Sequence, residues 1–290
     1  MKAPAFSYAR PSRLADVLAL LERHGDDARL LAGGQTLMAT LNMRLSEPAL
    51  LIDMQSVTEL KGLQLSGKML RIGAMVTHSE IEASILVAQH APLLTLAAPH
   101  IAHRAIRNLG TFGGSIAYAD PAAEWPACLL ALDGVVVARS LAGERRIAAS
   151  DFFTGLYTTA LGTNEVLVAC EIPLAPPSQR VAFDELARRH GDYAVVGLAA
   201  SAQWTQGAFD QVRLAWLGTG HMPLRSIATE QVLQGQRLSD PLLAQAVQTL
   251  RNELQTEADL THSAAAKQHL AGVMLKRCLK ALATPAAATA

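Results

Sequence analysis

The chain has 290 residues, which is enough to bury a large core and suggests roughly two domains. Its 25 basic and 25 acidic residues cancel, so it lacks the basic surplus that is typical of a dedicated nucleic-acid-binding protein. No apolar run approaches the roughly 20 residues of a membrane helix, and the N-terminus has no apolar signal core. We therefore expect a cytoplasmic protein that neither binds nucleic acid nor spans a membrane.

Neither the cysteines nor the histidines show the spacing of a metal site. Cys128, Cys170 and Cys278 are too far apart for the Cys-x-x-Cys ligands of zinc or an iron–sulfur cluster. The histidines that could be considered as ligands share no such spacing with a carboxylate or a cysteine: His24, His100 and His103. We predict reduced, buried thiols and no metal in this chain.

In the first part of the chain, helical and strand patterns alternate. The predicted elements, in order, are a helix at 13–23, a strand at 28–32, a helix from the next glycine pair to about Leu45, strands at 49–54 and 69–76, a short helix capped by Thr77 and Glu80, a helical stretch at 91–104, a helix at 123–132, a hairpin at 134–149 and a strand at 165–173. Pro173, Pro176 and Pro177 then predict a linker.

Beyond the linker the pattern changes to long strands followed by helices. We predict strands at 180–189, 193–204 and 211–218, and helices near 226–234, 240–254 and 263–282. Strands followed by helices indicate an antiparallel α+β unit. We therefore predict two domains, the first at 1–175 and the second at 178–290.

The first glycine-rich loop lies between the strand at 28–32 and its following helix. Its residues are Ala32, Gly33, Gly34, Gln35 and Thr36. Bare backbone N–H groups beside a helix N-terminus favour an anion, although the dipole contributes only about 0.3–1 kcal/mol. Taken alone, this loop could equally be a tight turn.

A second loop repeats this design, with residues Thr111, Phe112, Gly113, Gly114 and Ser115. Two such loops in one domain could clamp the two phosphates of a dinucleotide. The chain has no Gly-x-Gly-x-x-Gly motif after its first strand and no Gly-Lys-Ser/Thr phosphate loop. A Rossmann fold and a P-loop nucleotidase are therefore disfavoured.

Three segments carry a resemblance to a known family: "AGGQTLMATLNMRL", "IRNLGTFGGSIAYADPAAEWPA" and "RRHGDYAVVGLAA". Together with "LGTGHMPLRS" in the C-terminal part, they resemble the FAD-binding medium subunit of molybdenum hydroxylases, the carbon monoxide dehydrogenase and xanthine dehydrogenase family. The motifs occur in the family's order over nearly the whole chain.

The resemblance implies an α+β fold of the PCMH/vanillyl-alcohol-oxidase type. Two N-terminal α/β subdomains, at about 1–55 and 56–175, would hold FAD, followed by a C-terminal antiparallel sheet with helices. It also implies partners: a small subunit with two [2Fe–2S] clusters and a large subunit with a molybdenum–pterin cofactor, as an (αβγ)2 assembly. Electrons would pass from substrate at molybdenum through the clusters to FAD and an external acceptor, which stays open between NAD, a quinone, a cytochrome and oxygen.

The resemblance also assigns cofactor-binding residues, and no catalytic residue. The two glycine loops would hold the FAD pyrophosphate and neighbouring groups, while the remaining positions would contact the ribityl chain or the ring: Ile101, Asp120, Glu124, Leu167 and Tyr193. Glu124 would accept hydrogen bonds from ribityl hydroxyls, and Tyr193 would lie against the isoalloxazine ring. Because neither loop contains a histidine or cysteine, we predict noncovalent FAD.

The sequence departs from the family at two places. Tyr118 stands where many members have histidine, and Asp184 and Glu185 occupy a region where the eukaryotic enzymes have a lysine near the flavin. These acidic residues put in doubt any stabilisation of a reduced flavin anion from that region.

Other functions stay open at this point. Asp120 and Glu124 could be a general acid and base, but a FAD subunit needs no proton abstraction from substrate, so hydrogen bonding to the cofactor is preferred. Tyr193 could simply pack in the core of the second domain. The chain could also be a self-contained FAD-dependent oxidase or a flavin-free scaffold. Missing acid–base machinery disfavours the oxidase, and the intact glycine loops disfavour the scaffold.

Overall fold

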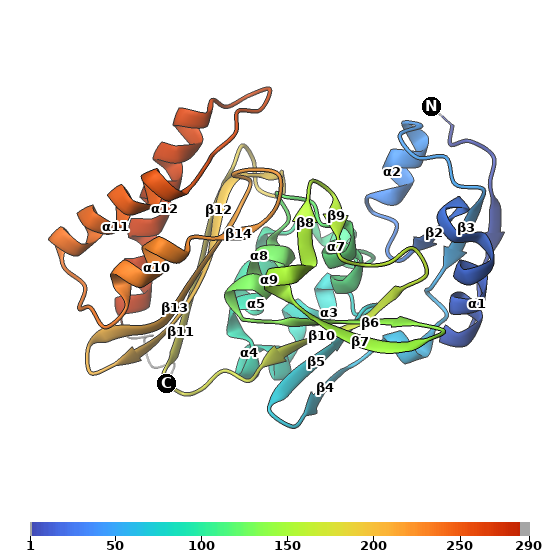
Figure 1. The fold of residues 1–290 in the computed structure, drawn as a ribbon, viewed down its shortest axis with the longest axis horizontal. Helices are drawn as coiled ribbons and strands as arrows, with labels where there is room; N and C mark the ends of the chain where they lie inside the picture. Colours follow the sequence, from blue (N-terminus) through green and yellow to red (C-terminus); the bar gives the residue numbers. More distant parts are fainter. Residues whose placement is uncertain (1, 285–290) are drawn as a thin grey trace.

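The computed structural model describes residues 2–284, which form three larger sheets with their helices and one two-stranded sheet (Figure 1). Residues 285–290, the end of the predicted second domain, lie outside the described residues. Within the described part of the chain, no helix is both long and apolar enough to cross a membrane.

The N-terminal unit is a three-stranded parallel sheet of order β1-β3-β2. Its elements are β1 (Ser7–Ala9), α1 (Leu14–His24), η1 (Gly25–Asp27), β2 (Ala28–Leu31), α2 (Leu37–Asn42), β3 (Leu50–Asp53) and η2 (Thr58–Leu60). The predicted helical face of α1 is buried through Leu14, Val17, Leu18 and Leu21. This apolar stripe fixes α1 on the sheet, so that β2 delivers the first glycine loop at its C-terminal end.

The central unit is a five-stranded antiparallel sheet of order β4-β5-β10-β6-β7, with short helices between its strands. Its strands are β4 (Leu63–Ser66), β5 (Met69–Gly73), β6 (Val135–Ser140), β7 (Gly143–Ala148) and β10 (Val166–Pro173), with the small hairpin β8 (Phe153–Gly155) and β9 (Thr158–Thr159). Its helices are α3 (His78–Ala83), α4 (Ile85–His90), α5 (Pro92–Ala97), η3 (Ala98–His100), α6 (Arg104–Arg107), α7 (Phe112–Tyr118), α8 (Glu124–Ala131) and α9 (Ala149–Phe152). The predicted capping box is present: Thr77 Oγ1 accepts from the Glu80 N–H, and the Glu80 carboxylate accepts from the Thr77 N–H.

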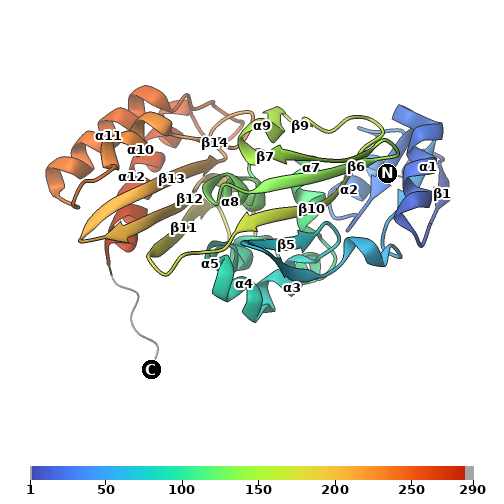
Figure 2. The same ribbon diagram turned by 60° about the horizontal axis from the view of Figure 1, so that its bottom comes forward.

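The C-terminal unit is a four-stranded antiparallel sheet of order β11-β12-β13-β14. Its elements are β11 (Gln179–Ala187), β12 (Ala194–Thr205), β13 (Ala208–Leu217), β14 (Leu224–Arg225), α10 (Ile227–Leu233), α11 (Asp240–Glu253) and α12 (Ala264–Ala283). Helix α12 packs on one face of the sheet, and α5 and α8 of the central unit pack on the other (Figures 1 and 2). The C-terminal sheet therefore contributes to two hydrophobic cores. Its face toward α5 and α8 joins the C-terminal unit to the central unit.

Two predicted helices are shorter than expected. The stretch at 91–104 breaks after α5, because Pro99 offers no N–H to continue the helix, and Ala102 then adopts a left-handed φ of 43°. The helix predicted to reach about Leu45 ends at Asn42, where Arg44 has a φ of 56° and the Leu45 N–H returns to the Thr40 carbonyl.

Candidate functional site

The two glycine loops are in direct contact. A Cβ on Gly33 would lie 2.2 Å from the Leu109 carbonyl oxygen and 2.7 Å from Gly110 Cα. A Cβ on Gly114 would lie 3.3 Å from Ala32 Cβ. The structure therefore brings together two segments that are far apart in the sequence, and glycine is required at Gly33 because backbone lies against it.

The first loop has unused hydrogen-bond donors. Among the described residues, no acceptor pairs with the N–H groups of Gly33, Gly34, Gln35 and Thr36. The loop is partly exposed, Gly34 has a φ of 72°, and the Gln35 side chain donates to the Gly33 carbonyl. A row of consecutive free N–H groups is a suitable cradle for a phosphate group. These residues fit the pyrophosphate of FAD.

The second loop does not offer such a cradle. Its N–H groups donate within the protein: Phe112 to the Val76 carbonyl, Gly113 to the Ala74 carbonyl, Gly114 to Thr111 Oγ1 and Ser115 to the Thr111 carbonyl. The expectation that both loops present bare N–H groups is therefore wrong for the second loop. Gly113 is needed for packing, because a Cβ there would lie 2.6 Å from Ala74 Cα. Apart from the N–H of the buried Thr111, the groups of this loop that could still contact a ligand are the side-chain hydroxyls of Thr111 and Ser115.

His78, which no sequence pattern indicates as a site residue, holds the start of the second loop in place. It is 6% exposed, its N–H donates to the Gly110 carbonyl, and its Nδ1 accepts from Trp125 Nε1 at 2.9 Å. Burial, and to a lesser degree the Arg107 charge, lowers the pKa of His78 to about 4. His78 thus stays neutral while it connects α3, the second loop and α8.

The predicted acidic residues lie where the central and C-terminal units meet. Asp120 Oδ1 accepts from the Ala122 N–H, and the Gly218 N–H from the end of β13 donates to the Pro121 carbonyl. Glu124 is the first residue of α8 and is 8% exposed. Burial raises the pKa of Asp120; burial, followed by the Glu185 charge, raises the pKa of Glu124 to about 8. A carboxyl with so high a pKa can hold a proton at neutral pH and both donate and accept hydrogen bonds.

Tyr193 is an exposed residue of the turn between β11 and β12. It is 67% exposed, so the alternative that it packs in the core of the second domain is wrong. Burial of its hydroxyl end raises the pKa of Tyr193 to about 12, followed by the charge of Asp120 and by Tyr157 and Tyr118. The rings of Tyr118 and Tyr157 are 5.1 Å apart. Tyr118, Tyr157 and Tyr193 therefore lie near Asp120. Of these three, Tyr157, at the tip of the β8–β9 hairpin, was not predicted as a site residue.

The remaining predicted residues are buried. Ile101 is 8% exposed, and its carbonyl accepts a hydrogen bond from the Arg107 side chain. The carbonyl of the following residue, Ala102, lies against Gly191 in the turn that carries Tyr193. Leu167 is 4% exposed, at an irregularity in β10. Ile101 thus lies near the Tyr193 turn, whereas Leu167 belongs to the core beneath α7.

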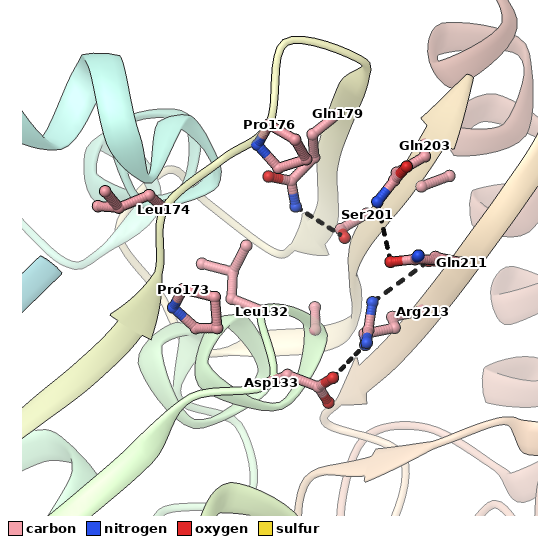
Figure 3. Close-up of a pocket in the computed structure, with 12 residues that line it drawn as sticks. Leu132, Asp133, Pro173, Leu174, Pro176, Gln179, Ser201, Gln203, Gln211 and Arg213 are labelled. Carbon is pink, nitrogen blue, oxygen red and sulfur yellow. Dashed lines mark hydrogen bonds and ion pairs between the residues drawn. The ribbon is translucent and has the colours of Figure 1, made fainter. Parts of the chain in front are cut away.

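A small pocket lies away from the two glycine loops (Figure 3). Its volume is about 110 Å³, and it contains none of the predicted residues. It separates α8 and β10 from the C-terminal sheet and is lined by Leu132, Asp133, Gln179, Gln203 and Arg213. Because sites for drug-sized ligands occupy roughly 300–1,000 Å³, it is too small for FAD. In the described part of the chain, no three histidine, cysteine, aspartate or glutamate side chains lie close enough together to hold a metal ion.

Comparisons with known proteins agree with this organisation. Residues 4–175 match the model described as "FAD binding domain in molybdopterin dehydrogenase", and residues 181–282 match "CO dehydrogenase flavoprotein C-terminal domain". The chain is 38% identical to the 6-hydroxypseudooxynicotine dehydrogenase complex subunit alpha of Paenarthrobacter nicotinovorans, over 96% of this chain and 95% of that protein.

Solved structures give the same result. The chain matches a carbon monoxide dehydrogenase structure from Hydrogenophaga pseudoflava with a TM-score of 0.95 and 34% identity, over 97% of this chain and 98% of that one. It matches quinoline 2-oxidoreductase from Pseudomonas putida 86 with a TM-score of 0.92 and 38% identity, over 97% and 98%. The predicted fold is therefore confirmed.

Proposed function

Because this chain belongs to the family of FAD-binding medium subunits of molybdenum hydroxylases, we propose that it carries noncovalent FAD at the junction of the two glycine loops. The observation that carries this proposal is the row of free N–H groups from Gly33 to Thr36, held against the second loop. FAD bound there would supply a redox centre that takes electrons from the [2Fe–2S] clusters of a small partner subunit and passes them to an external acceptor.

The chain's own residues bind and orient the cofactor. The first loop receives the pyrophosphate, and the hydroxyls of Thr111 and Ser115 contact it from the second loop. Glu124 would accept hydrogen bonds from the ribityl hydroxyls, Asp120 would form hydrogen bonds to the cofactor, and Tyr193 would lie against the ring. Ile101 and Leu167 form apolar surroundings. A large partner subunit, within an (αβγ)2 assembly, would hold the molybdenum–pterin cofactor and supply the oxidation of the substrate, and this chain would contribute no catalytic acid or base.

The visible spectrum of the purified chain tests this proposal. We expect flavin absorption bands, no turnover by the chain alone, and turnover after co-expression with its partner subunits. Acid precipitation should release the yellow cofactor into the supernatant, because no histidine or cysteine lies in either loop to form a covalent bond. Flavin that stays in the pellet would contradict noncovalent binding, turnover by the chain alone would favour an oxidase, and absence of flavin would favour a scaffold.

Tyr193 provides a test of the path of the electrons. An exposed aromatic ring beside Asp120 can cover the side of the flavin that faces the acceptor. In the assembled complex, Tyr193→Ala should leave flavin reduction by substrate nearly unchanged and alter reoxidation several-fold. Stopped-flow spectroscopy measures the two half-reactions separately.

The matched control is Tyr193→Phe, which keeps the ring and removes only the hydroxyl. It should behave like the wild type in both half-reactions. A Tyr193→Ala variant slowed only in the reductive half-reaction would mean that Tyr193 lies on the side of the iron–sulfur subunit.

A further inference from the structure

The motif "LGTGHMPLRS", which carries part of the family resemblance, begins at the end of β13. Its first glycine, Gly218, has a left-handed φ of 74°, and a Cβ there would lie 2.7 Å from the Val195 carbonyl oxygen and 2.8 Å from that of Ala194. The backbone that directly follows Tyr193 therefore lies against Gly218. Glycine is required at this position both for its φ and for this close approach.

Gly218 also holds the segment that carries the two predicted acidic residues. Its N–H donates to the Pro121 carbonyl at 2.8 Å. Pro121 directly follows Asp120, and Glu124 begins α8 just beyond it. One glycine therefore connects this acidic segment of the central unit to the Tyr193 turn of the C-terminal unit.

A lysine side chain holds Gly218 from the other side. Lys267 Nζ donates to the Gly218 carbonyl oxygen at 2.9 Å and lies 2.9 Å from Asp259 Oδ2. Its side chain is 9% exposed. Helices α12 and α8 pack on opposite faces of the C-terminal sheet (Figures 1 and 2). Gly218 is thus held by Lys267 of α12 on one side and by Pro121, just before α8, on the other.

Lysine is an unexpected residue at this position. Lys267 lies in the first turn of α12, where the helix dipole disfavours a positive charge, and buried lysines are rare unless they are paired. Its two contacts offset these costs. The Asp259 side chain is 42% exposed, so its ion pair contributes little, whereas the hydrogen bond to Gly218 is buried. The buried position of Lys267 is therefore best explained by its contact with Gly218.

The residues after Gly218 have a separate attachment to the connection between α11 and α12. The Glu257 N–H donates to the Thr219 carbonyl at 2.9 Å, and His221 Nε2 lies 3.0 Å from Glu257 Oε1. These contacts do not involve Lys267. Removal of the ammonium should therefore release Gly218 while the chain remains folded.

We propose that Lys267 is a positioning residue for the FAD site. By holding the Gly218 carbonyl, it fixes the acidic segment before α8 and the turn after β11 in the relative position that binds the cofactor. The inference rests on the proposed function, which assigns Asp120, Glu124 and Tyr193 to FAD. Lys267 acts through Gly218. Without the ammonium, the Gly218 backbone can shift, and the two parts of the site are no longer fixed relative to each other.

Titration of the FAD-free chain with FAD tests this role in Lys267→Met, which keeps the apolar stem of the side chain and removes the ammonium. Its Kd should rise roughly 3- to 10-fold, because part of the free energy of a charge-assisted hydrogen bond is lost from the site. At saturating FAD, the visible circular dichroism of the bound flavin should also differ from that of the wild type. A residue that only stabilises the fold would leave both readouts of the folded protein unchanged.

Two variants serve as controls. Asp259→Asn removes the charge of the ion pair but leaves Lys267 able to donate to Gly218. Lys276→Met removes a positive charge from an exposed position of the same helix. Both should bind FAD like the wild type. Wild-type Kd and flavin dichroism in folded Lys267→Met would overturn the proposal, and so would an equal loss of affinity in Asp259→Asn.

Hydrogen exchange followed by mass spectrometry gives a measurement that needs no variant. If Gly218 is coupled to the cofactor site, FAD binding to the wild type should slow exchange of the Gly218 N–H several-fold, although Gly218 is not itself assigned to the cofactor. In FAD-free Lys267→Met the same N–H should exchange faster than in the wild type. Unchanged exchange at Gly218 when FAD binds would contradict the coupling. Failure of the wild type to bind FAD would instead refute the proposed function.

Discussion

Gly33→Ala is expected to weaken FAD binding by roughly 10- to 100-fold while the chain remains folded. The new Cβ would lie 2.2 Å from the Leu109 carbonyl oxygen, and neither atom can move without its backbone. Overpacking of this kind costs about 1–3 kcal/mol, which the loops can relieve by moving apart. That movement separates the row of free N–H groups from the second loop. The free energy of overpacking is therefore measured as a lower affinity for FAD. Titration of the FAD-free protein with FAD measures it.

The control for this substitution is Gly220→Ala. A Cβ there would have its nearest neighbour, the Gln255 carbonyl oxygen, at 3.7 Å, an ordinary contact. Neither Gly33 nor Gly220 has a positive φ, so the two substitutions differ in space and not in backbone strain. Circular dichroism checks that both variants fold. Wild-type FAD affinity in folded Gly33→Ala would show that contact between the loops is not needed for binding.

The sequence predicts the position of the glycine loops, but not the reason for each glycine. Strand and helix periods indicate where β2 ends and α2 begins, because both patterns are local. The contact of Gly33 with Leu109 and Gly110 is not local, and no pattern near Gly33 indicates it. For the same reason, the internal hydrogen bonds that occupy the second loop's N–H groups, such as that of Gly113 to Ala74, could not be foreseen.

The residues that the sequence analysis missed show the same limit. His78 directly follows a capping residue that was predicted correctly, yet its partner Trp125 is 47 positions away. Tyr157 lies in a short hairpin whose strands have three and two residues, too short for an alternating pattern. The break near Ile101 had a local signal in Pro99, which the helical spacing of 91–104 obscured.

His78 should make the protein sensitive to mild acid. Its pKa is lowered from 6.5 to about 4 in the folded chain, so its contribution to stability is complete above pH 6.5 and is lost as the pH falls toward 4. A difference of this size corresponds to roughly 3 kcal/mol. His78→Gln keeps a side-chain acceptor for Trp125 Nε1 but cannot take up a proton. The variant should be less stable than the wild type at pH 7, because the amide fills the site less well, but its free energy of unfolding should fall less steeply between pH 6.5 and 4.

Urea denaturation at several pH values measures how the free energy of unfolding changes with pH. Subtracting the values of His78→Gln from those of the wild type removes the contribution of the other titrating groups. His190→Gln is the control, because His190 is exposed in the turn after β11 and its loss should leave the slope of the wild type unchanged. Equal slopes for His78→Gln and the wild type would mean that His78 is not held neutral. Acid should also release FAD before the protein unfolds globally, because protonated His78 can no longer accept from Trp125, whose ring packs against Phe112 of the second loop at 5.4 Å. The buried imidazole therefore links the pH stability of the fold to the geometry of the two loops.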